Sequence, residues 1–235
     1  MSRQLRLFDA IEQDQDHDAP LIGEPNAGAW GLLHQWPQWP SGALALIGPA
    51  GAGKTVLARA WAHAAGAAAL EAPVRAPVLE SAFSQSGGLV LLERADRMEA
   101  EPLVLAIDLA RAGSGALLLT ARTPPRRWPA DLPDLHSRLM ALAVAEIGPP
   151  DLEFVARLLQ RRLRNRYLAL EPDVANYCAV RLPRTYTAVL ALAEAMEEAC
   201  RRAVEPISHE VARRALERLF PDAEDPPSGA PELEP

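Results

Sequence analysis

The chain has 235 residues, a formal net charge of −7 and only two cysteines. This length is enough for one large domain or two small ones with a buried core. The acidic balance argues against a protein that coats nucleic acid, and two cysteines do not make a disulfide framework. The polar residues 1–4 lack the apolar stretch of a signal peptide, and no apolar run is long enough to span a bilayer. We therefore expect a soluble cytoplasmic protein without a membrane partner.

Residues 1–20 divide into a short apolar cluster and an acidic segment. Leu5, Leu7 and Phe8 lie close together beside Gln4, and residues 9–20 are rich in Asp, Glu and Gln. The acidic composition is typical of a flexible tail. The apolar side chains either pack on the surface of the following domain or form a short binding motif, and composition leaves both alternatives open.

The strongest motif in the chain joins a predicted strand to a predicted helix. After a short helix at about 27–35 and a Trp- and Pro-rich stop, the apolar run 43–47 enters the pattern G-x-x-x-x-G-K-[ST]. Backbone N–H groups of such a loop, together with the positive helix N-terminus, hold phosphate oxygens. Lys54 would reach the terminal phosphates and the Thr55 hydroxyl would bind Mg²⁺. The predicted nucleotide-binding residues of this loop are Gly48, Pro49, Ala50, Gly51, Ala52, Gly53, Lys54, Thr55 and Val56.

Two apolar residues upstream of the loop, Leu21 and Ile22, have two interpretations of equal weight. Apolar side chains just before a strand of this kind often contact the adenine of a bound nucleotide. They are equally well explained as part of the hydrophobic core.

Strands and helices continue to alternate after the loop, which predicts a parallel sheet with right-handed crossovers. We predict a weak strand at 67–70, a helix or loop at 79–85 and a helix at 98–112. Further strands are expected at 87–93, 116–120 and 141–147. A ligand would lie at the carboxyl ends of these strands, where Gly48, Glu93 and Arg122 fall. Glu93 ends its strand in the manner of a Walker B acid, and with Thr55 it is the candidate metal ligand.

A Pro-rich break at 148–151 separates this αβ region from an all-helical region. Helices are predicted at 151–167, 171–181, 185–203 and 208–219. The expected organisation is therefore a flexible tail at 1–20, a nucleotide-binding αβ domain at 21–150, a helical lid at 151–220 and a disordered acidic tail at 221–235.

A P-loop αβ domain followed by a small helical lid resembles the AAA+ arrangement, and several segments are similar to the DnaA family. These segments are Leu21-Ile22-Gly23 with Asn26, Thr123-Pro124-Pro125, Asp131-Leu132-Pro133-Asp134-Leu135-His136-Ser137-Arg138-Leu139, Ile147-Gly148-Pro149-Pro150-Asp151 and Arg181-Leu182-Pro183-Arg184. The N-terminal Gln4-Leu5-Arg6-Leu7-Phe8 also resembles the Q-L-x-L-F peptide that binds the bacterial sliding clamp. Together these features are similar to the Hda branch, called HdaA in alphaproteobacteria.

The resemblance implies an α/β AAA+ P-loop NTPase with a helical lid, binding ADP or ATP with Mg²⁺. Arg138 would be an arginine finger that acts on a nucleotide held by a neighbouring protein, and Arg184 the sensor II arginine that contacts this chain's own nucleotide. Clamp binding would use Gln4, Leu5, Leu7 and Phe8. The implied partners are the β sliding clamp and DnaA, in a replisome-associated negative regulator of replication initiation. Whether the chain forms a homodimer is left open.

Two positions depart from the DnaA pattern. DnaA has a second acid after the Walker B strand, where this chain has Arg94, and often Asp or Asn after the fourth strand, where this chain has Arg122. An arginine cannot act as a general base for the attacking water, and Asp96 is the possible substitute. We therefore expect nucleotide binding with weak intrinsic ATPase activity.

The sequence offers no region for the helix-turn-helix domain with which DnaA reads origin DNA, so we expect no sequence-specific DNA binding. One alternative function is a free-standing AAA+ ATPase resembling a helicase loader. Another is an adaptor that no longer binds nucleotide.

Overall fold

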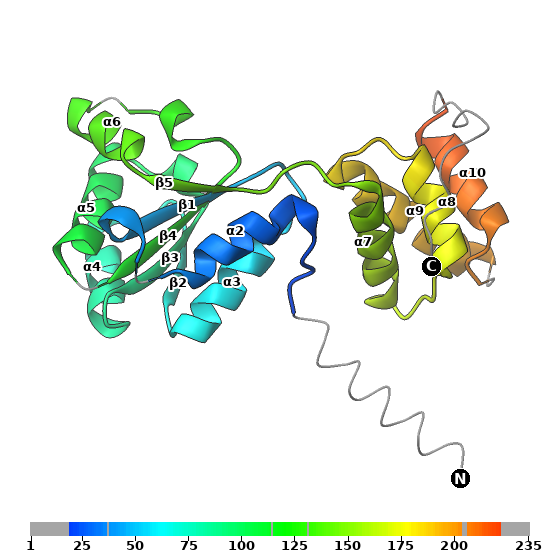
Figure 1. The fold of residues 1–235 in the computed structure, drawn as a ribbon, viewed down its shortest axis with the longest axis horizontal. Coiled ribbons are helices and arrows are strands. Elements are labelled where there is room, and N and C mark those ends of the chain that lie inside the picture. Colours follow the sequence, from blue (N-terminus) through cyan, green and yellow to red (C-terminus); the bar gives the residue numbers. More distant parts are fainter. Residues whose placement is uncertain (1–18, 37, 114, 131, 204–205, 222–235) are drawn as a thin grey trace, which may run out of the picture. The chain divides into compact units, whose positions relative to one another are not determined.

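The computed structural model describes residues 19–36, 38–113, 115–130, 132–203 and 206–221 (Figure 1). These residues form two compact units. The first contains Asn26–Gly148 and the described residues up to Ile22, and the second contains Gly23–Pro25 and the residues from Pro149 onward. Among the described residues, no helix combines the length and apolar character needed to cross a bilayer.

The first unit alternates helices and strands along the chain, as the sequence predicts. Its strands are β1 (Ala43–Ile47), β2 (Ala68–Glu71), β3 (Leu89–Glu93), β4 (Ala116–Ala121) and β5 (Ala143–Glu146). Its helices are α2 (Glu24–His34), whose first two residues are grouped with the second unit, α3 (Lys54–Ala65), α4 (Ala76–Gln85), α5 (Ala100–Ala112) and α6 (Pro133–Met140). Short 3₁₀ turns are η1 (Pro40–Gly42), η2 (Ala95–Arg97) and η3 (Pro125–Arg127).

The five strands form one parallel sheet in the order β2-β3-β4-β1-β5. In the register of the sheet, Ala45 on β1 pairs with Leu119 on β4 and with Val144 on β5. All residues of β1 and β4 are buried, because helices cover both faces of the sheet. This arrangement confirms the predicted parallel sheet, and it brings the carboxyl ends of β1, β3 and β4 to one edge.

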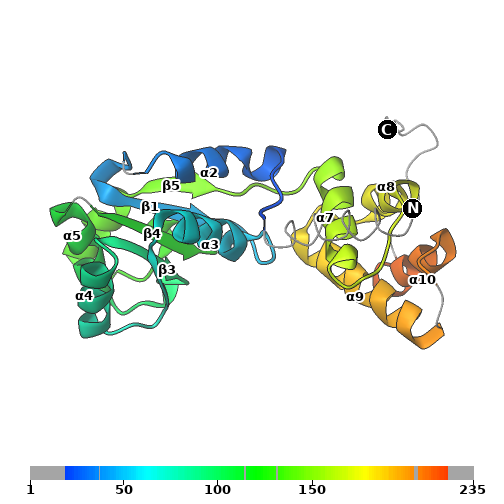
Figure 2. The same ribbon diagram turned by 90° about the horizontal axis from the view of Figure 1, so that it is seen from below.

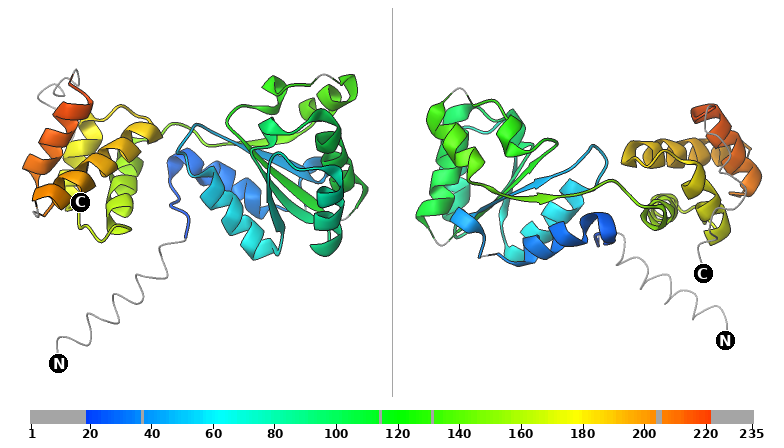
Figure 3. Two further views of the ribbon diagram at one scale, coloured as in Figure 1. Left: turned by 180° about the vertical axis from the view of Figure 1, so that it is seen from behind. Right: turned by 45° about the horizontal axis from the view of Figure 1, so that its top comes forward.

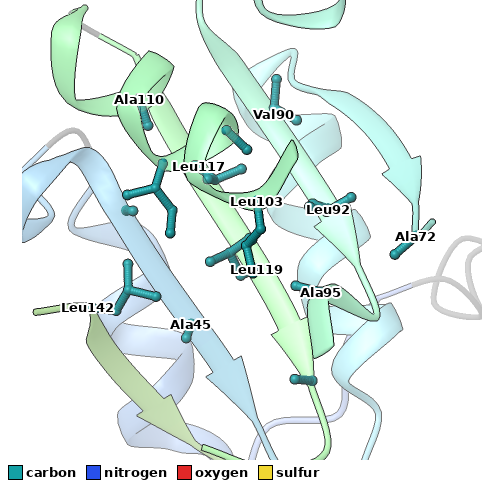
Figure 4. Packing of buried hydrophobic residues seen from close by; sticks show 14 of the residues in the cluster. Ala45, Ala72, Val90, Leu92, Ala95, Leu103, Ala110, Leu117, Leu119 and Leu142 are labelled. Carbon is teal, nitrogen blue, oxygen red and sulfur yellow. The ribbon is translucent and has the colours of Figure 1, made fainter. Parts of the chain in front are cut away.

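Helices cover the sheet in two layers, with α2 and α3 on one face and α4, α5 and α6 on the other (Figure 2, Figure 3). Alternate strand residues point to the second face, where they pack against α5 (Figure 4). Val90, Leu92, Leu117 and Leu119 meet Leu103 there, and all are almost fully buried. Burial of each large aliphatic side chain contributes roughly 1.5–3 kcal/mol.

Three tryptophans pack together in the layer that contains α2 and α3. The Trp61 ring on α3 lies 5.2 Å from that of Trp39 and 6.3 Å from that of Trp36, measured between ring centroids. Trp39 Nε1 donates a hydrogen bond of 2.7 Å to the Leu32 carbonyl on α2. The segment that leads into β1 is thereby packed against α3, the helix that follows the phosphate loop.

The second unit is a helix bundle made of α7 (Leu152–Arg164), α8 (Pro172–Arg181), α9 (Tyr186–Ala203) and α10 (His209–Leu219). Side-chain caps start two of these helices, because the Asp151 carboxylate accepts from Phe154 N and the Ser208 hydroxyl accepts from Val211 N. The bundle core is apolar, and Leu192 is one of its fully buried residues. All four helices were predicted from the sequence to within a few residues.

The structure resolves three points that the sequence left open or missed. Residues 76–85 form the helix α4, where the sequence allowed a helix or a loop. Helix α6 was not predicted, and α2 begins three residues earlier than expected. Only Leu135 and Leu139 of α6 are buried, so its eight residues carry a weak periodic signal.

Candidate nucleotide-binding site

The phosphate loop connects β1 to α3 with two glycines in left-handed backbone conformations. Gly51 has φ of +80° and Gly53, which caps α3, has φ of +83°. Residues with a Cβ rarely adopt these angles, so glycine is favoured at both positions. A third glycine, Gly48, lies so close to Ile147 that an added Cβ would be 3.0 Å from the Ile147 Cβ. The loop therefore has the backbone freedom that close approach to phosphate oxygens requires.

Lys54 lies over this loop and is the only lysine in the chain. Its Nζ donates to the carbonyl oxygens of Gly48 at 2.7 Å and Pro49 at 2.8 Å. Burial lowers the Lys54 pKa from its ordinary value and the nearby Arg122 guanidinium lowers it further, whereas Asp96 acts in the opposite direction. Lys54, Arg122 and Asp96 thus share the carboxyl edge of the sheet.

Glu93, at the end of β3, is only 7% exposed and engages both of its carboxylate oxygens. The Thr55 hydroxyl donates to Oε2 at 2.7 Å, and Arg59 Nε donates to Oε1 at 2.8 Å. Thr55 and Arg59 are four residues apart on α3, so they lie on the same helix face. Arg59 was missed in the sequence analysis, although its spacing from Thr55 was the available signal.

Arg94 follows Glu93 but turns away from it. Its backbone is left-handed, with φ of 57° and ψ of 43°, and its N–H donates to Thr120 Oγ1 at 3.2 Å. Its guanidinium pairs with Glu71 on β2, with Nη1 and Oε1 2.7 Å apart. The position that holds a second acid in DnaA is thus occupied by a cation bound to another strand, while Asp96 lies in η2.

Leu21 and Ile22 are half-buried in the first unit. The buried Asn26 side chain donates to the Leu21 carbonyl at 2.8 Å and fixes the backbone there. Neither residue belongs fully to the core, and contact with an adenine stays a prediction. Val56, in the first turn of α3, is exposed.

Arg138 lies on α6, and its side chain is 18% exposed. It pairs with Asp108 on α5 and with Asp134 one turn earlier on its own helix. The hydrogen bonds from Arg138 hold the Asp108 pKa below its ordinary value and raise the pKa of the arginine itself. The predicted finger is therefore bound within its own chain.

Arg184 is exposed in the second unit, just before α9, whereas the phosphate loop belongs to the first. Its role toward a nucleotide stays a prediction. The predicted clamp-binding residues Gln4, Leu5, Leu7 and Phe8 lie outside the described residues, so their role also stays a prediction.

Comparison with known proteins shows the fold. No family model and no curated protein sequence matches this chain. Among solved structures, domain III of the Thermotoga maritima replication initiation protein DnaA is similar, with a TM-score of 0.65, 13% identity, and coverage of 86% of this chain and 96% of that one. The Thermotoga maritima RuvB Holliday junction branch migration motor has a TM-score of 0.60 and 19% identity, covering 77% of this chain and 63% of that chain.

A third structure, described as a DNA replication initiation factor, has a TM-score of 0.60 and 15% identity, and covers 84% of this chain and 66% of that chain. The chain therefore has the AAA+ P-loop NTPase fold, as predicted. Placement in the Hda branch stays a prediction, because likeness at these identities concerns the fold alone.

Proposed function

We propose that this protein is a nucleotide-holding regulator of replication initiation that promotes hydrolysis of ATP bound to DnaA. In this proposal Gln4, Leu5, Leu7 and Phe8 dock on the β sliding clamp, and Arg138 reaches the nucleotide of DnaA. The structural likeness to DnaA domain III over 86% of the chain supports a role among DnaA-related proteins. The location would be cytoplasmic and close to the replisome.

The observation that carries the proposal is the ion pair between Arg94 and Glu71. A nucleotide-hydrolysing site needs a group that orients the attacking water, and an arginine directed to another strand cannot do so. The glycine loop and Lys54 can nevertheless hold phosphates. Such a site favours retention of a bound nucleotide rather than its hydrolysis. Any hydrolysis that the protein promotes would therefore take place in a partner.

In this chain the loop N–H groups would bind the phosphates of ADP or ATP, and Lys54 would move from its loop carbonyls to the terminal phosphate oxygens. When bound, Mg²⁺ would supply Lewis acidity at those oxygens. The Thr55 hydroxyl fits such a role because its oxygen keeps a lone pair while it donates to Glu93. Arg184 would contact the same nucleotide from the helical lid.

Arg138 would act in the partner's site through its permanent charge. A guanidinium placed against developing phosphoryl charge accelerates hydrolysis by roughly 10³–10⁵. For this to happen, Arg138 must exchange its bonds to Asp108 and Asp134 for bonds to the nucleotide.

The test is single-turnover hydrolysis of labelled ATP bound beforehand to DnaA. The full chain would be added with and without clamp loaded on DNA, and compared with Arg138→Ala and with a Leu7→Ala, Phe8→Ala double variant. Arg202→Ala is the matched control, because Arg202 forms an exposed helical ion pair in the second unit. We expect clamp-dependent acceleration that both test variants lose and the control keeps.

If Arg138→Ala accelerates the hydrolysis of DnaA-bound ATP as much as wild type does, Arg138 is not the arginine finger. No acceleration by wild type, together with rapid ATP turnover by this protein alone, would support a free-standing ATPase resembling a helicase loader.

A further inference from the structure

The phosphate site contains an arginine that the sequence motif does not include. Arg59 lies on α3 one helical turn after Thr55, and its Nε donates to Glu93 Oε1 at 2.8 Å. The other oxygen of the same carboxylate accepts from Thr55 at 2.7 Å. Glu93 thus has its negative charge compensated, and each of its oxygens engaged, by side chains of the chain itself.

A carboxylate in this environment is a poor ligand for a free divalent cation. Mg²⁺ prefers anionic oxygens in strict octahedral geometry and gives up its water reluctantly. To bind Glu93 directly, it would have to displace the guanidinium from a carboxylate that is only 7% exposed. Direct binding would therefore exchange one counter-charge of Glu93 for another and give up the hydrogen bond from Arg59, whose side chain is 64% exposed.

The remaining charges at this edge of the sheet are already suited to an anionic ligand. Lys54 lies within electrostatic reach of Arg122 and Asp96, and Arg59 pairs with Glu93. Glu71, the register partner of Glu93, is paired with Arg94. Once the Arg59–Glu93 and Arg94–Glu71 pairs are set aside as neutral, Lys54 and Arg122 stand against one carboxylate, Asp96, without a contribution from a metal ion.

We propose that Arg59 supplies at Glu93 the counter-charge that Mg²⁺ supplies in metal-dependent sites, so that a nucleoside diphosphate binds here without Mg²⁺. This inference rests on the proposed nucleotide binding and specifies its chemistry. It assigns Arg59 as a positioning residue, because it acts on the nucleotide through Glu93. It also removes Glu93 from the predicted metal ligands and leaves the Thr55 hydroxyl as the only one.

The test is calorimetric titration of ADP into the full chain, once in MgCl₂ and once in EDTA. For wild type we expect dissociation constants that agree within about threefold between the two buffers. In Arg59→Ala the Glu93 carboxylate would lack its counter-charge and would repel the phosphates. We therefore expect ADP binding to weaken about tenfold or more in EDTA and to recover in MgCl₂. A second change, Glu93→Gln in the Arg59→Ala background, should abolish this sensitivity to EDTA.

Arg202→Ala serves as the control for loss of an exposed helical arginine, and thermal unfolding shows whether each variant is folded. If wild type binds ADP more than about tenfold more tightly in MgCl₂ than in EDTA, the assignment of Arg59 is overturned while nucleotide binding stands. If wild type binds ADP in neither buffer, the proposed nucleotide binding itself fails. The assignment of Arg59 is also overturned if Arg59→Ala is folded and binds ADP with the same dissociation constant in both buffers.

Discussion

Arg138 and Asp108 form a two-point ion pair, with Nε 2.8 Å from Oδ1 and Nη2 2.9 Å from Oδ2. The pair joins α6 to α5, and Asp134 adds a contact from within α6. A residue that serves a partner's nucleotide must break both contacts first. The availability of Arg138 therefore depends on how strongly Asp108 holds it.

Replacing Asp108 by Asn should raise the stimulation of DnaA-bound ATP hydrolysis. Asn keeps the side-chain shape but loses the charge that retains the guanidinium, and the 43% exposure of the Asp108 side chain keeps the expected effect at a few-fold. Single-turnover rates at limiting concentrations of this protein provide the measurement. Asp173→Asn, an exposed acid of the second unit, is the control, and an unchanged or lower rate for Asp108→Asn would show that the pair does not restrain Arg138.

Introducing an acid at position 94 should not give this protein rapid ATPase activity. Arg94 has a left-handed backbone and lies against Glu71, so Arg94→Glu would place two carboxylates together instead of one near the P-loop. We expect slow phosphate release in multiple-turnover assays from wild type, from Arg94→Glu and from Arg94→Glu combined with Glu71→Gln. Many turnovers per minute from Arg94→Glu alone would contradict the geometry.

Truncation of Leu192 to Ala should destabilise the helical unit. The Leu192 side chain on α9 is fully buried in the apolar core of the bundle, and its removal leaves a cavity that costs about 2–5 kcal/mol of unfolding free energy. Thr187→Ala, at an exposed position of the same helix, should change the unfolding free energy by less than about 0.5 kcal/mol. Urea unfolding followed by circular dichroism compares the two, and equal effects would contradict the packing.

The Cys178 thiol should resist alkylation at pH 8 until the helical unit unfolds. Burial raises its pKa to about 12, so the reactive thiolate is scarce and inaccessible in the native state. A Cys200→Ser background isolates this thiol for a chromogenic disulfide reagent.

The same pKa shift makes stability depend on pH. Because the unfolded thiol loses its proton near its ordinary pKa of 9.0 and the folded thiol near 12, this group should lower stability as the pH rises between those values. Rapid labelling of the Cys178 thiol in the native protein at pH 8 would contradict the burial on which both of these predictions rest.

The sequence predicted well what short segments determine by themselves. The strand, glycine loop and helix around Lys54 form one local motif, and the buried strands β3 and β4 consist largely of continuous apolar runs. Helix α6 was missed because it begins at Pro133 in a Pro-rich region and buries only two leucines. No local pattern could show that Glu93 meets Arg59, since 34 residues separate them and the sheet brings them together.

Lys54, the single lysine of this chain, is the one side-chain amine that an acylating reagent can modify, and its Nζ is hydrogen-bonded to carbonyl oxygens of the phosphate loop. Because the pKa of Lys54 is lowered, a larger share of its amine is nucleophilic at moderately alkaline pH than in an ordinary surface lysine. A bound nucleotide would shield it, so mass spectrometry of one acylated peptide would report how full the site is. Any acylation of a lysine in this protein, chemical or enzymatic, would for the same reason remove the charge that Lys54 contributes to the proposed phosphate binding.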